Sequence, residues 1–188
     1  MRLIKSLQQI LLILLVFVPA GAIAGAEVLT LEIDGDAEID IRIFRAEGDT
    51  LLLGFACDEG QGIAEQSTAE SLAEDGVEVW MPDMLGGYML PKTRSSIYSI
   101  PSEGLYRVME EAMETGKKVF LIASGPDTEL VLRVANEWEA KHDGTAAGLA
   151  GVVLMFPRLN EGKPEPGKAP VYVEAVGKTK EVPLLVLE

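Results

Sequence analysis

The spacing of apolar residues changes several times along the chain, and each change marks an expected strand, helix or turn. The segments Val28–Ile33 and Glu38–Phe44 alternate apolar and polar residues on either side of the turn sequence Asp34-Gly35-Asp36. Alternation with a period of two around an Asp-Gly turn is typical of a β-hairpin. We therefore expect two antiparallel strands at the start of the folded domain.

Strand-like and helix-like segments then follow one another. Short apolar runs predict strands at Thr50–Phe55, Val77–Met81, Val119–Ile122 and Leu149–Phe156. Helical spacing predicts helices at Ile63–Asp75, with Ala64, Thr68, Ser71 and Leu72 inward, and at Ser102–Thr115, with Leu105, Val108, Met109, Ala112 and Met113 on one face. Because parallel neighbours need crossover connections, this alternation predicts an α/β fold with a doubly wound, mostly parallel sheet.

A third helix follows a short turn after Val119–Ile122. Its apolar residues share one face: Leu130, Val131, Val134, Ala135 and Trp138. The continuous apolar run before the turn suits a strand that is buried on both faces. The turn itself, Ala123-Ser124-Gly125-Pro126-Asp127, resembles the nucleophile elbow of the α/β-hydrolase superfamily, in which the nucleophile stands between two small positions.

The register of this turn decides which residue is the candidate nucleophile. Aligning the turn on both the strand and the helix places Gly125 at the nucleophile position, between Ala123 and Asp127, so the reactive hydroxyl is missing. A shift of one residue makes Ser124 the candidate catalytic residue, but it places Ile122 and a proline where the motif requires small residues. The alternative role for Ser124 is a helix N-cap that accepts a hydrogen bond from the backbone N–H of Asp127.

The resemblance extends over Val28–Phe156. The sequence Met81-Pro82-Asp83-Met84-Leu85-Gly86-Gly87, at a predicted strand end, resembles the proline-aspartate turn of the superfamily, and the order of hairpin, strands and helices agrees as well. The resemblance implies an oxyanion loop within Gly54–Gly60, and a catalytic acid and a histidine from loops after the last strands. The single histidine, His142, lies instead at the far end of the helix that follows the elbow.

The last part of the chain is less regular. Residues Pro157–Pro170 are rich in proline, glycine and lysine and predict a loop, and Val171–Val176 is a further strand candidate. Val182–Leu187 predicts a buried strand with no segment after it. An uncovered sheet edge at this strand fits either a truncated hydrolase or an edge that a partner strand covers.

Residues 1–26 have the three regions of a secretory signal peptide: Arg2 and Lys5, the apolar run Ile10–Val18, and a tail of small residues. The protein is therefore expected to be exported, either periplasmic or secreted, with no stable membrane anchor after cleavage following Ala24 or Ala26. Cleavage removes two of the 16 basic residues and none of the 30 acidic ones, so the net charge changes from −14 to −16. Such an acidic protein is not expected to bind nucleic acid.

Residues 27–188 are expected to form one α/β-hydrolase-like domain with no cofactor and no metal. The lone Cys57 leaves no internal disulfide and suits a packed small residue. The acidic spacing from Asp34 to Asp40 lacks the glycine and the distant glutamate of a calcium loop.

Open α/β sheets bind ligands at the carboxyl ends of their strands, so a small anionic ligand or a protein partner is expected there. Lys92 and Arg94, in a long loop at that edge, are the candidate ligand-binding residues, and an ordinary solvated loop is the alternative.

Three functional hypotheses are open. The first is a binding or accessory module that lacks a complete catalytic triad. The second is a serine ester or acyl hydrolase that uses Ser124, with a base supplied by a partner or by another copy of the chain. The third is a truncated hydrolase.

Overall fold

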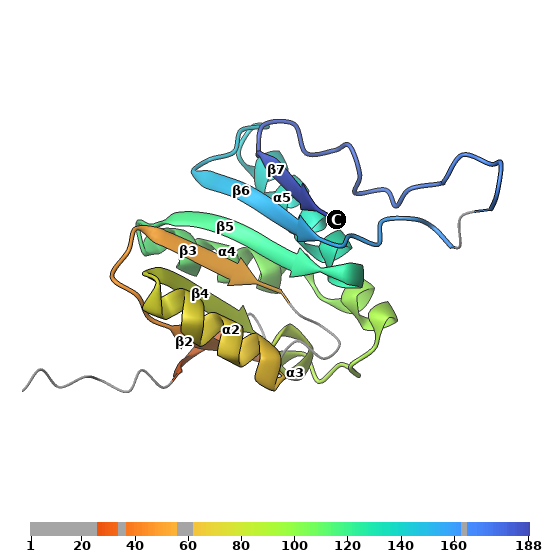
Figure 1. The fold of residues 1–188 in the computed structure, drawn as a ribbon. Coiled ribbons are helices and arrows are strands. Elements are labelled where there is room, and N and C mark those ends of the chain that lie inside the picture. Colours follow the sequence, from red (N-terminus) through yellow and green to blue (C-terminus); the bar gives the residue numbers. More distant parts are fainter. Residues whose placement is uncertain (1–25, 34–36, 56–61, 163–164) are drawn as a thin grey trace, which may run out of the picture.

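A seven-stranded sheet in the order β1-β2-β4-β3-β5-β6-β7 forms the centre of the computed structural model, which describes residues 26–33, 37–55, 62–162 and 165–188 (Figure 1). β1 pairs antiparallel with β2, and β2 with β4, whereas the other neighbouring strands are parallel. This arrangement confirms the expected mostly parallel sheet with an antiparallel hairpin. The strands are β1 (Glu27–Glu32), β2 (Glu38–Phe44), β3 (Thr50–Gly54), β4 (Val77–Pro82), β5 (Lys118–Ser124), β6 (Leu149–Met155) and β7 (Leu184–Leu187).

Helices cover the two faces of the sheet unequally. Helices α4 (Ser102–Glu114) and α5 (Thr128–Lys141) lie behind the sheet, and α2 (Ile63–Glu74) lies in front of it (Figure 1). The main core lies between the sheet and the pair α4 and α5, where the expected apolar faces of both helices are buried except for the half-buried Met113. None of the described helices combines the length and the apolar character that crossing a membrane requires. The short elements are α3 (Met84–Gly87), η1 (Arg94–Ser99) and η2 (Gly125–Asp127).

Helix α2 is less buried than its sequence predicts. Ala69 is its one buried residue among those described, and it packs with Leu72 against the sheet residues Phe44, Val79 and Met81. The expected inward positions Ala64, Thr68 and Ser71 are exposed, so that part of the prediction is wrong. The reason is that α2 contacts β4 and β2, while Figure 1 shows no described helix in front of β5, β6 and β7.

The same incomplete cover changes the expected burial of two strands. In β5, Val119, Leu121 and Ala123 are buried, but Phe120 and Ile122 on the α2 side are only half-buried, so β5 is not buried on both faces. β7 lies at the edge of the sheet, and its four residues are between 44% and 53% exposed. The prediction of a buried final strand is therefore wrong in burial, although the strand itself is present.

The segment before β7 is irregular. The expected loop at Pro157–Pro170 is confirmed where it is described, but Val171–Val176 forms no strand and makes a single isolated bridge, from Tyr172 to Asn160. The buried carboxylate of Glu139 on α5 holds the end of this segment by accepting hydrogen bonds from the backbone N–H groups of Lys180, Glu181 and Val182. Burial tends to raise the pKa of Glu139, but these hydrogen bonds outweigh it and hold the pKa below its usual value.

In the turn after β4, Asp83 and Gly86 are joined by a hydrogen bond, which accounts for their spacing of three residues. Oδ1 of Asp83 accepts a hydrogen bond from the backbone N–H of Gly86 at 2.9 Å, which caps α3. A Cβ atom on Gly86 would overlap this carboxylate, so a larger residue at this position would displace the capping side chain of Asp83. The backbone N–H of Asp83 also donates to the carbonyl oxygen of Asp40 at 2.8 Å. The turn thereby joins the end of β4 to β2.

A buried charge cluster joins three segments at the end of the sheet where β4 and β5 begin. Glu78 on β4 is 2% exposed, and its carboxylate accepts hydrogen bonds from Lys117 at 2.8 Å, from the indole N–H of Trp80 at 2.6 Å and from Arg45 at 3.2 Å. Lys117 also donates to the carbonyl oxygen of Ala46 at 2.6 Å. Burial tends to raise the pKa of Glu78, but Lys117, Trp80 and Arg45 together hold it below its usual value.

We predict that Lys117→Met lowers the free energy of unfolding by about 3 kcal/mol, because it leaves the buried carboxylate of Glu78 without its closest charged partner. The matched control is Lys118→Met, which removes an exposed ion pair with Asp49 and is expected to leave stability unchanged. Urea denaturation measures both variants. Equal losses in the two variants would contradict a special role for Lys117.

The same cluster gives the stability a defined pH dependence. Because the pKa of Glu78 is lower in the folded protein, its contribution is complete above the pKa of an unfolded glutamate and is lost as the pH falls through the folded pKa. The difference between the wild type and Lys117→Met should therefore shrink in acid.

Candidate functional site

The turn after β5 has the backbone of an elbow. Ser124 is the last strand residue and is extended, with φ −124° and ψ 154°, and Gly125 follows with φ +55°. This left-handed backbone favours glycine over residues with a Cβ atom. A Cβ atom built on Gly125 would meet none of the described residues within 4 Å, so these residues leave the space in front of the turn open. The chain therefore makes a sharp strand-to-helix turn at the position where the resemblance places the nucleophile.

Ser124 does not have the capping role that the sequence predicts. Its side chain makes no capping hydrogen bond, and it is exposed. The buried Thr128, at the start of α5, closes the turn instead, because its hydroxyl donates to the carbonyl oxygen of Gly125 at 2.7 Å. The predicted hydrogen bond from the backbone N–H of Asp127 is therefore wrong. The extended backbone of Ser124 directs its side chain to the same face of the sheet as Ile122, away from the helix start.

A groove of about 400 Å³ lies directly below Ser124, between α2 and the half-covered face of the sheet. Its floor is formed by strand residues that include Leu52, Ile122 and Met155, and Ala64, Thr68 and Leu72 of α2 form its wall. These three helix residues are spaced by four and therefore lie along one stripe of α2. The residues that were expected to pack inward thus face a space that the described residues leave open.

None of the other candidate residues is placed at the elbow by the part of the chain that the structure describes. Cys57 and most of the expected oxyanion loop lie outside the described residues. Lys92 is exposed in the segment before η1 and does not line the groove, and the structure describes the backbone of Arg94 but not its side chain. A small-anion site at Lys92 and Arg94 stays a prediction.

His142 lies far from the elbow. It follows the last residue of α5, and a helix of 14 residues is about 20 Å long. Its ring lies 4.2 Å from that of Trp138 and 6.2 Å from that of Tyr106, centroid to centroid, and its Nδ1 is 2.7 Å from the carbonyl oxygen of Trp138. His142 is thus held at the end of α5 by aromatic packing.

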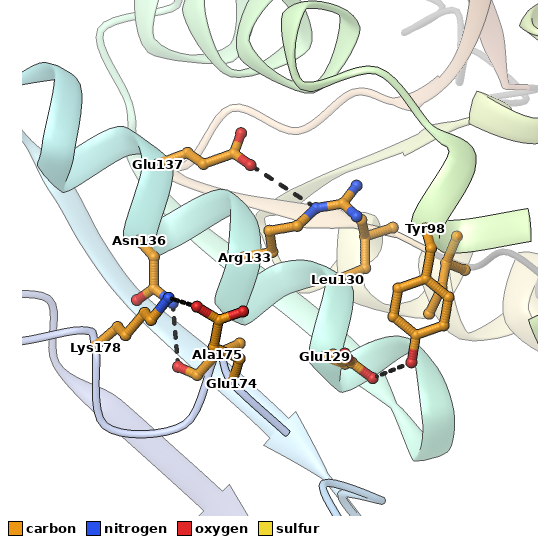
Figure 2. A pocket seen from close by; sticks show the side chains of 10 residues that line it. Tyr98, Glu129, Leu130, Arg133, Asn136, Glu137, Glu174, Ala175 and Lys178 are labelled. Carbon is orange, nitrogen blue, oxygen red and sulfur yellow. Dashed lines mark hydrogen bonds and ion pairs between the residues drawn. The ribbon is translucent and has the colours of Figure 1, made fainter. Parts of the chain in front are cut away.

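A second cavity, of about 360 Å³, lies between α5, η1 and the segment before β7 (Figure 2). Its polar groups pair with one another. The Tyr98 hydroxyl donates to Glu129 at 2.7 Å, and the amide of Asn136 donates to the carbonyl oxygen of Ala175 at 3.1 Å. Lys178 pairs with Glu174 at 2.5 Å, and Arg133 donates to the carbonyl oxygen of Ile100 at 3.2 Å. These contacts mainly fasten η1 and the irregular segment to α5.

No metal centre is found among the described residues, since no three of their histidine, cysteine, aspartate and glutamate side chains are grouped as metal ligands. The elbow and the groove below it are therefore the features on which a functional proposal can be built.

The strand order, the antiparallel start, the crossover helices and the turn after β5 together define an α/β-hydrolase fold. The chain has this fold, and it is similar to several solved structures. Esterase Est22 matches with a TM-score of 0.57 and 12% identity over 85% of this chain and 51% of the esterase. The thioesterase domain from the curacin biosynthetic pathway matches with a TM-score of 0.51 and 19% identity over 76% of this chain and 48% of that domain.

Brefeldin A esterase, described as a bacterial homologue of human hormone sensitive lipase, matches with a TM-score of 0.51 and 17% identity, over 76% of this chain and 43% of the esterase. The chain thus spans about half the length of the solved structures it matches. No model of a protein family and no curated protein matches the sequence.

The sequence did not reveal the groove. The one sequence feature that hints at the groove is the composition of one face of α2, where Ala64, Thr68 and Leu72 stand four residues apart. Small residues on an inward helix face leave room for something to pack against them. The sequence alone does not tell whether a strand, another helix or a ligand fills that room.

We predict that Thr128→Val lowers the free energy of unfolding by about 1 kcal/mol, because the hydroxyl that closes the elbow is buried and hydrogen-bonded. Ser124→Ala, in the strand before the turn, should leave stability unchanged, since it removes no capping hydrogen bond. Both values come from denaturant unfolding. A larger loss in Ser124→Ala than in Thr128→Val would reinstate Ser124 as the cap.

Proposed function

We propose that the protein is an exported α/β-hydrolase-fold binding or accessory module, with no complete triad of its own, that holds a ligand in the groove below the elbow. The observation that carries this proposal is Gly125. The turn keeps the left-handed backbone and the open space of an elbow, but the residue at that point has no side chain. A triad requires a nucleophile, a base and an orienting acid within hydrogen-bond reach of one another.

The position of His142 supports the same proposal. An acyl hydrolase needs a base beside its nucleophile, and the ring of this histidine packs against Trp138 at the opposite end of α5. The groove has the size of a small-molecule site, since such sites have volumes of about 300 to 1,000 Å³. Its lining is mostly apolar, which is also typical of such sites.

One observation favours a second candidate function, a serine ester or acyl hydrolase that uses Ser124. The side chain of Ser124 is exposed, makes no capping hydrogen bond and lines the groove. In this alternative a partner or another copy of the chain supplies the base. The matched structures include an esterase and a thioesterase domain, so acyl transfer is the reaction to test first.

We predict that a fluorophosphonate probe does not label the mature protein at Ser124 and that short aryl esters are hydrolysed no faster than in buffer. Labelling is read by mass spectrometry on the wild type, Ser124→Ala and the control Ser71→Ala, an exposed serine on α2. Because Ser124→Ala removes no capping bond, a loss of labelling in this variant alone would reflect chemistry and not unfolding. That result would replace the binding module with the hydrolase.

Export is supported by the sequence of the first 26 residues. We predict that expression of the full chain in a bacterial host yields a protein that begins at Gly25 or Glu27, because signal peptidase cleaves after Ala24 or Ala26. The mass of the intact protein in the periplasmic or culture fraction measures this. An unprocessed chain with Met1 in the cell membrane fraction would contradict it.

A further inference from the structure

Glu139 is a buried carboxylate that the proposed binding function does not use. It lies near the end of α5 and is 4% exposed. Its Oε1 atom accepts hydrogen bonds from the backbone N–H groups of Val182 at 2.7 Å and Glu181 at 3.0 Å, and its Oε2 atom accepts one from Lys180 at 3.1 Å. Three consecutive N–H groups of the segment that leads into β7 therefore bind one carboxylate of α5.

Few other contacts hold this part of the chain. Among the described residues after β6, only Val173 and Val182 are buried. The side chain of Asn136 donates to the carbonyl oxygen of Ala175 and accepts from the hydroxyl of Thr179. β7 pairs with β6 over four residues, and all four of its side chains are exposed. Because little apolar surface is buried here, we expect this segment to open locally at a much lower free energy than the whole domain.

Protonation weakens the contact between Glu139 and the segment. An ionised carboxylate accepts hydrogen bonds at both oxygens, whereas a protonated one carries an O–H group that needs an acceptor. Burial tends to raise the pKa of Glu139, but the hydrogen bonds from the segment hold it below its usual value. Their contribution to stability is therefore complete above the pKa of an unfolded glutamate and is lost as the pH falls through the folded pKa.

The charged groups around Glu139 leave it as the acid-sensitive member of this contact. Among the described residues, Lys180 is the charged side chain whose field acts on the carboxylate, and it favours the ionised form. Glu181 on the same segment is exposed. On α5 the ring of His142 bonds to a backbone carbonyl of the helix, and α4 packs against α5 through Tyr106. The strands below α5 present apolar residues to it.

We propose that Glu139 is an acid-sensitive latch, whose protonation releases residues 174–187 from α5 and β6 while the rest of the fold stays intact. Release removes one wall of the second cavity, formed by Glu174, Ala175 and Lys178, and opens the facing side of α5 (Figure 2). β6 then becomes the edge of the sheet. The latch lies at the end of α5, whereas the elbow lies before its start, so the release is separate from the proposed binding function.

Hydrogen exchange of the mature protein, expressed as protection factors of peptides, tests the release. At neutral pH the peptide 178–187 should be protected. At about pH 3.5, below the ordinary pKa of a glutamate, its protection should fall at least tenfold, while a peptide within α4 keeps its protection. Equal losses in the two peptides would show global unfolding and would overturn the latch.

The variant Glu139→Gln tests the carboxylate itself. Glutamine replaces one acceptor oxygen with an NH₂ group, which is a donor that faces other donors. The variant should show, already at neutral pH, the loss of protection that the wild type shows in acid, with no further loss on acidification. The matched control is Glu114→Gln, which removes an exposed glutamate at the end of α4 and should behave as the wild type. An unchanged acid response in Glu139→Gln, or the same loss in Glu114→Gln, would contradict the proposal.

The wild type provides a second test that does not require the variant to fold. The carboxyl carbons of Glu139 and of Glu78, the other buried glutamate among the described residues, titrate separately in NMR spectra. Release of residues 178–187 should follow the midpoint of Glu139. A release that follows Glu78, or one without an acid midpoint, would overturn the latch. None of these measurements uses a ligand or labelling at Ser124, so failure of the latch is distinct from failure of the proposed function.

Discussion

The packing of α4 and α5 against one face of the sheet is the interaction on which the rest of the structure depends. Leu105, Val108, Val131 and Val134 of these helices are buried, and the helices contact strands β5 and β6. Full burial of such side chains contributes about 1.5 to 3 kcal/mol each. Both helices connect strands of the sheet. Their packing therefore determines where β5 ends, and with it the position of the turn at Gly125.

The opposite face of the sheet is covered over only part of its width. Helix α2 lies on β4 and β2, while the residues of β5, β6 and β7 on that side stay half-buried or exposed. Apolar surface left in water is unfavourable, and large apolar patches on soluble proteins commonly mark binding sites. The unequal cover of the two faces explains all three corrections to the predicted burial: the exposed stripe of α2, the half-buried side of β5 and the exposed edge strand β7.

The turn after β5 has the backbone of a nucleophile elbow, but it has glycine where the elbow carries the nucleophile. A left-handed conformation at Gly125 is inexpensive for glycine and costs a residue with a Cβ atom about 1 kcal/mol or more. The hydroxyl of Thr128 fastens the turn from the helix side. The shape of the elbow is thus maintained by backbone and helix packing, independently of a catalytic side chain at position 125.

The sequence by itself determined the element order, the fold and the inward faces of α4 and α5, because these follow from local apolar periodicity and from the need of parallel strands for crossover helices. It also located the turn at Gly125, since strand, small residues and helix adjoin there. Only the tertiary structure decided the rest. The face of α2, the exposure of β7, the unused hydroxyl of Ser124 and the groove below it depend on which elements lie opposite in space. Local spacing carries no information about an opposing surface that is only partly covered.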